Sequence, residues 1–403
     1  MSKPIRLGVV GGNRGRGFGQ SLATLKKDMI LTAICDLNPG VCASWKSDFP
    51  GIQTYTDYEH LLDSGTVDAV LIATPMHLHV SQSIAALRRG IHVASEVTAC
   101  NTIAEGRQLI RAVERSKAVY FFAENYCYSR MHMMVEQMCH KGIFGEISYV
   151  SGSYYHDCLP LMFDAKGQLT WRGEIRRDWQ CNCYPTHSLG PIARWLGIRE
   201  GRDRLVSVSA HMSRQVSATA YCTRRFGPKS PYAQPDYFKL GDTVKTLVKT
   251  KKGILIDLLF DTASPRVGNC AEHFIAGTGA SFHSFTPIPF DDGMRAGPGI
   301  CYGSKGRGEG CPHYLWEPLM DEARKYEHPV WKKHMQKAER AGHGGGDYFI
   351  LMDFVNAIRG RCAPAIDVYD GVLWSSLIEL SAQSIRAGGK AISIPEFRPK
   401  SLK

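Results

Sequence analysis

A short segment in the middle of the chain brings together two side chains that can carry out proton chemistry. It reads NCYPTHSLGP over residues 182–191 and contains Tyr184 and His187. An imidazole titrates near neutral pH, so His187 can act both as an acid and as a base. A histidine between apolar residues is often structural, but the polar motif around this one favours a catalytic site.

Two cysteines beside this segment, Cys181 and Cys183, offer other chemistries. With His187 they resemble the beginning of a zinc site, but no second closely spaced pair of ligands follows, and zinc sites usually need one. A nucleophilic pair of Cys183 and His187 would rest on proximity alone. We therefore predict no metal and keep acid–base chemistry as the leading interpretation.

The chain begins with a different pattern, an apolar strand followed by glycines in IRLGVVGGNRGRG. Glycine at such a turn lets the backbone approach a pyrophosphate, which the amides of the next helix bind. Gly12 and Gly15 have the offsets of the dinucleotide-binding fingerprint, although Val10 stands where its first glycine belongs. Together with Asn13 and Arg14 between them, these glycines are predicted to bind a nucleotide cofactor.

Asp36 strengthens this interpretation. It ends the second apolar run, close to where an acidic residue binds the ribose hydroxyls of a dinucleotide. A carboxylate there repels a 2′-phosphate, which favours NAD over NADP. The alternative is that DLNPG, residues 36–40, is only turn chemistry. The order of strand, glycines, helix and Asp36 favours an NAD site.

The elements that must position these residues change in character near residue 125. Before it, short apolar runs alternate with helical patterns, which is typical of a parallel sheet covered on both faces. After it, longer and partly alternating runs indicate a large, mostly antiparallel sheet with one exposed face. The expected strands are Ile5–Val10, Ile30–Cys35, Ala69–Ala73, His92–Ser95 and Val119–Ala123, then Ile147–Ser153, Leu205–His211, Thr243–Lys249 and Ile254–Phe260.

We expect two domains, because 403 residues are too many for one compact core. The predicted class is α/β, with a Rossmann dinucleotide-binding domain over residues 1–125. Residues 126–403 are predicted to form an α+β domain that binds the substrate, with a large open sheet and late helices that pack back on the first domain. Two Gly/Pro-rich stretches, 226–235 and 287–312, are expected to be surface loops.

Composition excludes several classes of function. The net charge of +11 comes from scattered pairs such as Lys26–Lys27, without a basic block interleaved with aromatics, so we expect no nucleic-acid partner. An anionic cofactor or substrate suits this charge. No apolar run reaches the ~20 residues of a membrane span. Irregularly spaced cysteines indicate reduced thiols, and the first strand follows Met1 closely, so we expect a cytoplasmic protein.

The segment VLIATPMHLH, residues 70–79, resembles the Gfo/Idh/MocA family of sugar oxidoreductases. In that family the segment lies against the cofactor, which implies that Thr74, Pro75 and His79 lie near NAD. The alternative for His79 is a residue at the start of a helix that packs against the sheet.

One difference from that family lies at the end of the next strand. The family usually has Glu-Lys-Pro there, and its lysine assists proton transfer at the reacting hydroxyl, whereas this chain has Glu96, Val97 and Thr98. Glu96 stays a predicted cofactor-site residue. Because simple dehydrogenation of an alcohol needs an acid or base that valine cannot supply, the difference argues against an ordinary sugar dehydrogenase.

Further segments are similar to one branch, glycoside hydrolase family 109, whose members hydrolyse glycosides, notably N-acetylgalactosaminides, with bound NAD. The segments are ENYCYSR (124–130), GEISYVSGSYYHD (145–157), WRGEIRRDW (171–179), YPTHSLGPIARWL (184–196) and GHGGGDY (342–348). The resemblance implies a sugar site and a homo-oligomer, a dimer or tetramer. One segment departs from this resemblance: the stretch after Asp261, TASPRVGNC, lacks a tyrosine that the resemblance leads us to expect. The identity of the sugar that is recognised therefore stays open. The implied sugar-site residues are Glu124, Tyr154, Arg172, Tyr184 and His187.

The resemblance implies hydrolysis by a redox route. NAD takes hydride from carbon 3, which acidifies the proton on carbon 2; a base removes that proton, the aglycone leaves, water adds, and NADH reduces the ketone again. Tyr154 is predicted to be the elimination base if a cation such as Arg172 lowers its pKa. His187 is predicted to act at the leaving group or ketone. Which of the two takes which role stays open.

These side chains also have structural explanations. Tyr154 stands beside Tyr155 on an expected strand, where core packing competes with catalysis. His156 and Asp157 can be the working pair instead.

Two further residues keep open alternatives. Arg172 next to Trp171 can be a stacked surface pair. His343, before a run of glycines, is either a sugar ligand or the entry to a helix. The alternative functions are an NAD-dependent sugar or glycoside 3-dehydrogenase that releases a 3-keto sugar, and a non-catalytic sugar or NAD sensor.

Overall fold

The computed structural model describes residues 3–265, 270–290, 293–304 and 314–399. It contains two compact units, which are described separately. The first unit comprises Met1–Arg130 and His328–Ser376, and the second comprises Met131–Glu327 and Leu377–Lys403. The domain boundary predicted near residue 125 stays a prediction.

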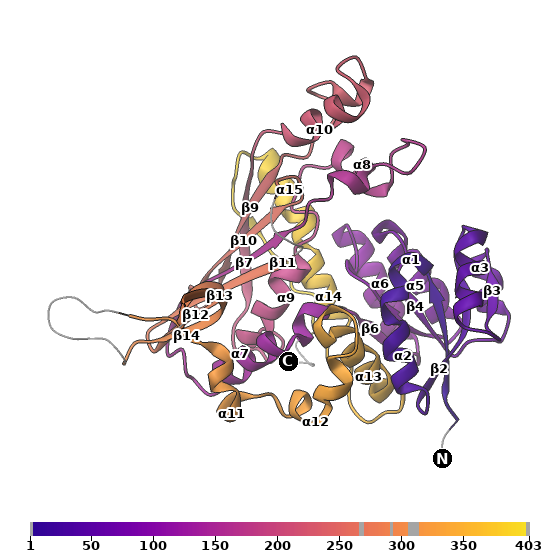
Figure 1. Ribbon diagram of the computed structural model, residues 1–403, viewed down its shortest axis with the longest axis horizontal. Helices are drawn as coiled ribbons and strands as arrows, with labels where there is room; N and C mark the ends of the chain where they lie inside the picture. The colour runs from indigo at the N-terminus through magenta and orange to yellow at the C-terminus, as the bar shows by residue number, and fades with distance from the viewer. Residues whose placement is uncertain (1–2, 266–269, 291–292, 305–313, 400–403) are drawn as a thin grey trace. The chain divides into compact units, whose positions relative to one another are not determined.

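The first unit contains a six-stranded parallel sheet in the order β3-β2-β1-β4-β5-β6. Figure 1 labels β2, β3, β4 and β6 of this sheet. The strands β1 and β4 are buried almost throughout, as expected where helices cover both faces of a parallel sheet. The strands are β1 Ile5–Val10, β2 Met29–Cys35, β3 Gln53–Tyr55, β4 Ala69–Ile72, β5 His92–Ser95 and β6 Tyr120–Phe122.

The helices of this unit come from both of its chain segments. The helix α6 begins at a capping box, in which Thr102 and Glu105 each accept from the other's backbone N–H. Residues 328–376 belong to the unit: α13 packs against α2, and Phe122 N–H donates to Ile366 O at 3.1 Å. The helices are α1 Gly12–Gly15, α2 Gly19–Leu25, α3 Pro39–Asp48, α4 Tyr58–Asp63, α5 His79–Arg88, α6 Ile103–Arg115, α12 Pro329–Ala338, α13 Gly346–Ile358 and α14 Val368–Ser375.

The second unit contains a nine-stranded sheet in the order β14-β13-β12-β11-β7-β10-β9-β8-β15. Its neighbours are antiparallel except for the parallel pair β7 and β10. Along β9, buried and exposed residues alternate, because one face of the sheet is covered and the other is open. The strands are β7 Ile147–Tyr155, β8 Leu205–Met212, β9 Thr243–Thr250, β10 Leu255–Asp261, β11 Cys270–Gly277, β12 Ala280–Phe290, β13 Gly293–Tyr302, β14 Glu317–Pro318 and β15 Ile392–Ser393.

Helices cover one face of this sheet: α9 packs on β7 and α15 packs on β8. The predicted combination of a Rossmann sheet and a larger, mostly antiparallel sheet is confirmed. None of the helices in the described ranges is both long and apolar enough to cross a membrane. The helices are α7 Arg130–His140, α8 Trp171–Asp178, α9 Thr186–Trp195, α10 Ser217–Phe226, α11 Ala323–Tyr326 and α15 Leu377–Arg386.

The loop predicted over residues 287–312 is wrong in part, because β12 continues to Phe290 and β13 occupies Gly293–Tyr302. The prolines in this stretch suggested a loop, since proline cannot donate to a sheet. The recorded pairs of β12 with β11 involve Ser281–His283, whereas those with β13 reach Phe290. Within the described ranges, the second half of β12 therefore has a recorded partner strand on one side only, and prolines are tolerated on such an edge of a sheet. Residues 305–312 lie outside the described part of the chain.

Candidate functional site

The carboxyl ends of β1 and β4 form the first candidate site. These strands are neighbours where the strand order reverses, and ligands of such sheets bind beyond that point. Gly11 follows β1 with φ +89°, and a Cβ there would lie 2.5 Å from Ala73 O. Gly11 therefore makes the tight turn that the fingerprint assigns to its first glycine, one position later than the spacing predicted.

Asp36 meets this turn directly. Its Oδ2 accepts the N–H of Gly12 at 2.8 Å, and its Oδ1 accepts the N–H of Asn38 at 2.9 Å. Gly15 lies so close to the side chain of Val9 that a Cβ would collide with it, which is the packing role of the fingerprint's last glycine. Asn13, between these glycines, is exposed. The structure thus brings the glycine turn and the acid together, as the sequence suggested.

A chain of charged side chains links this turn to a distant part of the sequence. Arg14 Nη2 lies 2.5 Å from Glu96 Oε1 and 3.3 Å from Asp347 Oδ1. The other oxygen of Asp347, which is fully buried, lies 2.9 Å from His343 Nδ1. Within the first unit, the predicted cofactor residues Arg14 and Glu96 therefore meet the predicted sugar ligand His343. Asp347 was missed, although an acid one turn after a histidine was a visible signal.

His79 is buried between the two loops that follow β4 and β5. Its Nε2 lies 2.8 Å from Thr74 O and its Nδ1 lies 2.8 Å from Thr98 O. Burial lowers the pKa of His79, which favours a neutral ring. Half-buried Pro75 follows Thr74, whose hydroxyl donates to Gln82 Oε1 at 2.6 Å. His79 is the first residue of α5, and its ring joins the two loops that follow β4 and β5.

The end of β6 adds two buried polar residues to this edge. Glu124 is fully buried, and its Oε1 accepts the N–H of Tyr126 at 3.2 Å. Asn125 is also buried, and its Oδ1 has no hydrogen-bond partner among the described residues. Such an acceptor is costly unless a ligand satisfies it. The turn at Gly11, the carboxylate of Asp36 and this acceptor therefore fit a dinucleotide, and Asn125 is a residue that sequence reasoning missed.

The second unit gathers two phenols and two imidazoles around Tyr154 at the end of β7. The ring centroid of Tyr154 lies 5.4 Å from that of Tyr184 and 5.2 Å from that of His187. The rings of Tyr184 and His187 are themselves 5.0 Å apart. Tyr154 Oη lies 2.9 Å from His156 Nδ1. We call these four residues the ring cluster; it unites three predicted residues with His156, which the sequence offered only as an alternative.

The position of His187 depends on how α9 is held. A Cβ at Gly152 on β7 would lie 2.8 Å from Ser188 O, so glycine permits the close approach of helix and strand. Ser188 O also lies 2.9 Å from Nε2 of buried His273, whose Nδ1 is 3.1 Å from His132 Nε2. The ring of Pro191 removes the N–H that would bond the carbonyl of His187. These contacts fix the first turn of α9, where His187 lies.

Two arginines on α8 differ in how they are held, and the charge of one of them acts on the ring cluster. The guanidinium of Arg172 lies over the ring of Trp171 at 4.2 Å, so the stacked pair exists, and its charge also acts on His156. One turn later, buried Arg176 donates to Thr262 Oγ1 at 2.7 Å, and its Nη1 has no partner in the described residues. Burial is the main reason why the pKa of Arg176 is lowered. Arg176 was not singled out from the sequence.

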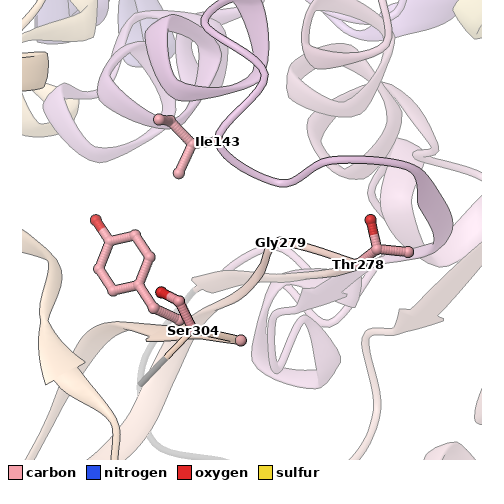
Figure 2. Close-up of a pocket in the computed structure, with 6 residues that line it drawn as sticks. Ile143, Thr278, Gly279 and Ser304 are labelled. Atoms are coloured by element: carbon pink, nitrogen blue, oxygen red, sulfur yellow. The ribbon is translucent and has the colours of Figure 1, made fainter. Parts of the chain in front are cut away.

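Other features of the second unit do not add chemistry to this site. Cys181 Sγ and Cys183 Sγ lie 3.5 Å apart, and no group of three metal-binding side chains occurs among the described residues. A hollow of about 590 Å³ is lined by residues without a carboxylate, imidazole or amine, and it contains none of the predicted site residues. Figure 2 shows its lining: Ile143, Thr278, Gly279, Tyr302, Gly303 and Ser304.

The predicted site residues fall into two groups. The cofactor residues lie in the first unit together with Glu124 and His343, and the ring cluster and Arg172 lie in the second. Thr186, inside the Tyr-Pro-Thr-His motif, was missed: it is fully buried, and its hydroxyl oxygen has no partner among the described side chains and backbone. Its place between Tyr184 and His187 in the sequence was the signal that could have singled it out.

Fold and sequence comparisons agree on the class of protein. Residues 5–124 match the family model described as "Oxidoreductase family, NAD-binding Rossmann fold". A levoglucosan dehydrogenase in complex with NADH has the same fold, with a TM-score of 0.73 and 18% identity over 98% of this chain and 100% of that one. The first unit therefore contains an NAD-binding Rossmann domain of the Gfo/Idh/MocA type.

The rest of the chain assigns the family. Residues 128–402 match "Glycosyl hydrolase 109, C-terminal domain". A glycosyl hydrolase family 109 protein of Solibacter usitatus is 31% identical over 98% of this chain and 88% of its own length. An alpha-N-acetylgalactosaminidase of Tannerella forsythia is 29% identical, with coverage of 98% and 86%. The chain belongs to glycosyl hydrolase family 109, and the resemblance seen in its sequence is confirmed.

Proposed function

We propose that this chain hydrolyses a hexopyranoside through oxidation at carbon 3, elimination, water addition and re-reduction. The observation that carries the proposal is the ring cluster in a chain of glycosyl hydrolase family 109. Most glycosidases use two carboxylates across the glycosidic bond. The ring cluster consists of phenols and imidazoles, and the charges of Arg172 and Asp157 act on His156; phenols and imidazoles suit proton transfer next to a ketone. The first substrate to test is an N-acetylgalactosaminide, the class named for the Tannerella forsythia relative.

Each residue receives a role in this proposal. NAD held at the glycine turn would supply the hydride acceptor for carbon 3 and return the hydride at the end. Tyr154 removes the proton from carbon 2, and His187 protonates the leaving oxygen and then activates water. Arg172 and Tyr184 orient the sugar hydroxyls.

The two remaining predicted sugar ligands belong to the first unit. Glu124 is proposed to hold a sugar hydroxyl through its carboxylate. His343 is proposed to do the same with its ring, whose side chain stays 46% exposed while Asp347 fixes its Nδ1. Val97 is buried at the position where the related oxidoreductases have a lysine. This replacement supports a glycosidase rather than a simple dehydrogenase.

The test is to incubate the protein with a panel of aryl glycosides in deuterated water, without added cofactor. We expect release of the aryl group, deuterium at carbon 2 of the sugar and no net NADH. Tyr154→Phe should reduce this exchange by about 10²-fold or more, because it removes the base. Tyr155→Phe, the next residue on the strand, is the matched control and should exchange normally.

Two other outcomes would contradict the proposal. Aryl release without deuterium at carbon 2 would indicate direct hydrolysis. Accumulation of NADH and a 3-keto sugar when NAD is supplied would identify a sugar dehydrogenase instead.

A further inference from the structure

The hydroxyl of Tyr154 and the imidazole of His156 form a hydrogen-bonded pair where β7 ends. The distance from Tyr154 Oη to His156 Nδ1 is 2.9 Å. Residues two apart on an extended chain point to the same face. The backbone N–H of His156 donates to Asp261 O at 3.0 Å, which continues the sheet for one residue beyond β7. The position of the imidazole is therefore fixed by the sheet rather than by a free loop.

The surroundings of His156 favour its neutral ring. Burial is the largest cause that lowers the pKa of His156, and its electrostatic interactions with Arg172 and His187 lower it further. Asp157 alone acts in the opposite direction, but it is exposed and its Oδ1 accepts the N–H of Leu159. A neutral imidazole has one nitrogen that accepts a hydrogen bond. The phenol of Tyr154 can therefore donate to His156 Nδ1 near neutral pH.

A phenol needs such a partner if it is to act as a base. Its ordinary pKa of about 10 means that it holds its proton at neutral pH. We propose that His156 is the proton acceptor that positions and activates Tyr154, an inference that rests on the proposed function. As the C–H bond at carbon 2 breaks, an O–H bond forms on Tyr154 while its original proton moves to His156 Nδ1. The electron pair of the C–H bond goes to the enolate beside the carbon 3 ketone.

The variant His156→Asn separates hydrogen bonding from proton transfer. The asparagine Oδ1 can accept the phenol hydrogen bond in place of Nδ1, but an amide does not take the proton. We expect the exchange at carbon 2 to fall by about 10²-fold with KM little changed. Hydride transfer from carbon 3, followed as NADH absorbance in a single turnover, should keep its wild-type rate.

The pH profile gives a readout that a purely structural role would not change. In the wild type, the exchange rate should fall as pH decreases through the pKa of His156, because the protonated ring cannot accept a proton. This limb should disappear in His156→Asn. His283→Asn, which alters another histidine whose pKa is lowered by burial but which lies outside the ring cluster, should leave both rate and profile unchanged.

These experiments distinguish failure of the role proposed for His156 from failure of the proposed redox function. If the wild type exchanges deuterium and His156→Asn does so at the same rate with the same acid limb, the role of His156 is wrong and the proposed function stands. If the variant loses hydride transfer and exchange equally, its role is structural and the inference is also wrong. If the wild type shows no exchange, the redox function itself fails.

Discussion

His79, whose ring is fully buried, shows how one imidazole can make stability depend on pH. Its ring nitrogens face two backbone carbonyls, and burial lowers its pKa below the ordinary value of about 6.5. The unfolded chain therefore binds a proton at His79 at higher pH than the folded chain does. The contribution of neutral His79 to the free energy of unfolding is present above about pH 6.5, and it is lost as pH falls towards the lowered pKa of the folded state.

We expect the free energy of unfolding to fall with pH more steeply in the wild type than in His79→Asn. The difference should approach one proton, about 1.36 kcal/mol per pH unit, between about pH 6.5 and the lowered pKa. Urea denaturation from about pH 7.5 to about pH 5 checks this. The other histidines whose pKa is lowered by burial are present in both proteins and cancel. Parallel curves would show that His79 is not protonated on unfolding.

Single residues also show what sequence can and cannot predict. Gly12, Gly15 and Asp36 could be grouped because the ends of neighbouring parallel strands meet at one edge. The ion pair between Arg14 and Asp347 could not, because their separation of 333 residues leaves no local pattern. The sequence offered a cation such as Arg172 as a group that could lower the pKa of Tyr154, but it gave no sign that the hydroxyl lies 2.9 Å from His156 Nδ1, because which polar neighbour a side chain meets depends on packing.

At the scale of elements, the contact between β7 and α9 determines the ring cluster. β7 carries Tyr154, and α9 carries His187 in its first turn. Their distance is set where the helix passes over Gly152. The sequence predicted β7 and a polar motif after it, but not that α9 crosses β7, since long-range packing has no signal in one strand's periodicity.

Gly152→Ala should therefore displace α9 and impair the chemistry. Its Cβ would lie 2.8 Å from Ser188 O, so we expect a loss of about 1–3 kcal/mol in the free energy of unfolding and a lower kcat. Gly297→Ala on β13 is the matched control, because its Cβ would meet only Ile288 Cδ1 at 3.8 Å. Urea denaturation and aryl glycoside turnover measure both effects. Equal behaviour of the two variants would refute the packing argument.

At the scale of the molecule, the first unit is made from two separate stretches of chain. Residues 328–376 supply Asp347, which binds Arg14, and Trp331, whose Nε1–H donates to Tyr128 O at 2.8 Å. They also supply Ile366, which accepts from Phe122 beside the sheet. Composition and motif order predicted the Rossmann sheet, but they gave no measure of how much it depends on the late helices.

A fragment of residues 3–130 should therefore be incompletely folded. We expect this fragment to unfold without cooperativity and to bind NAD weakly. A protein in which residues 3–130 are joined to residues 328–376 by a flexible Gly/Ser linker should unfold cooperatively and bind NAD more tightly. Thermal unfolding by circular dichroism and NAD titration by calorimetry compare the two. If the short fragment is as stable as the joined one, residues 328–376 are an addition rather than a part of the folding unit.

This division also sets an order of events during synthesis on the ribosome. At about 5–20 residues per second, residues 328–376 follow the end of the first stretch by roughly 10–50 s. Throughout that interval the nascent Rossmann sheet lacks the helices that cover part of it, while residues 131–327 of the second unit are being translated. Apolar surface exposed for so long is what chaperones bind. The late return of the chain thus means that the cofactor domain, although it is the first to be started, is completed only after most of the second unit has been made.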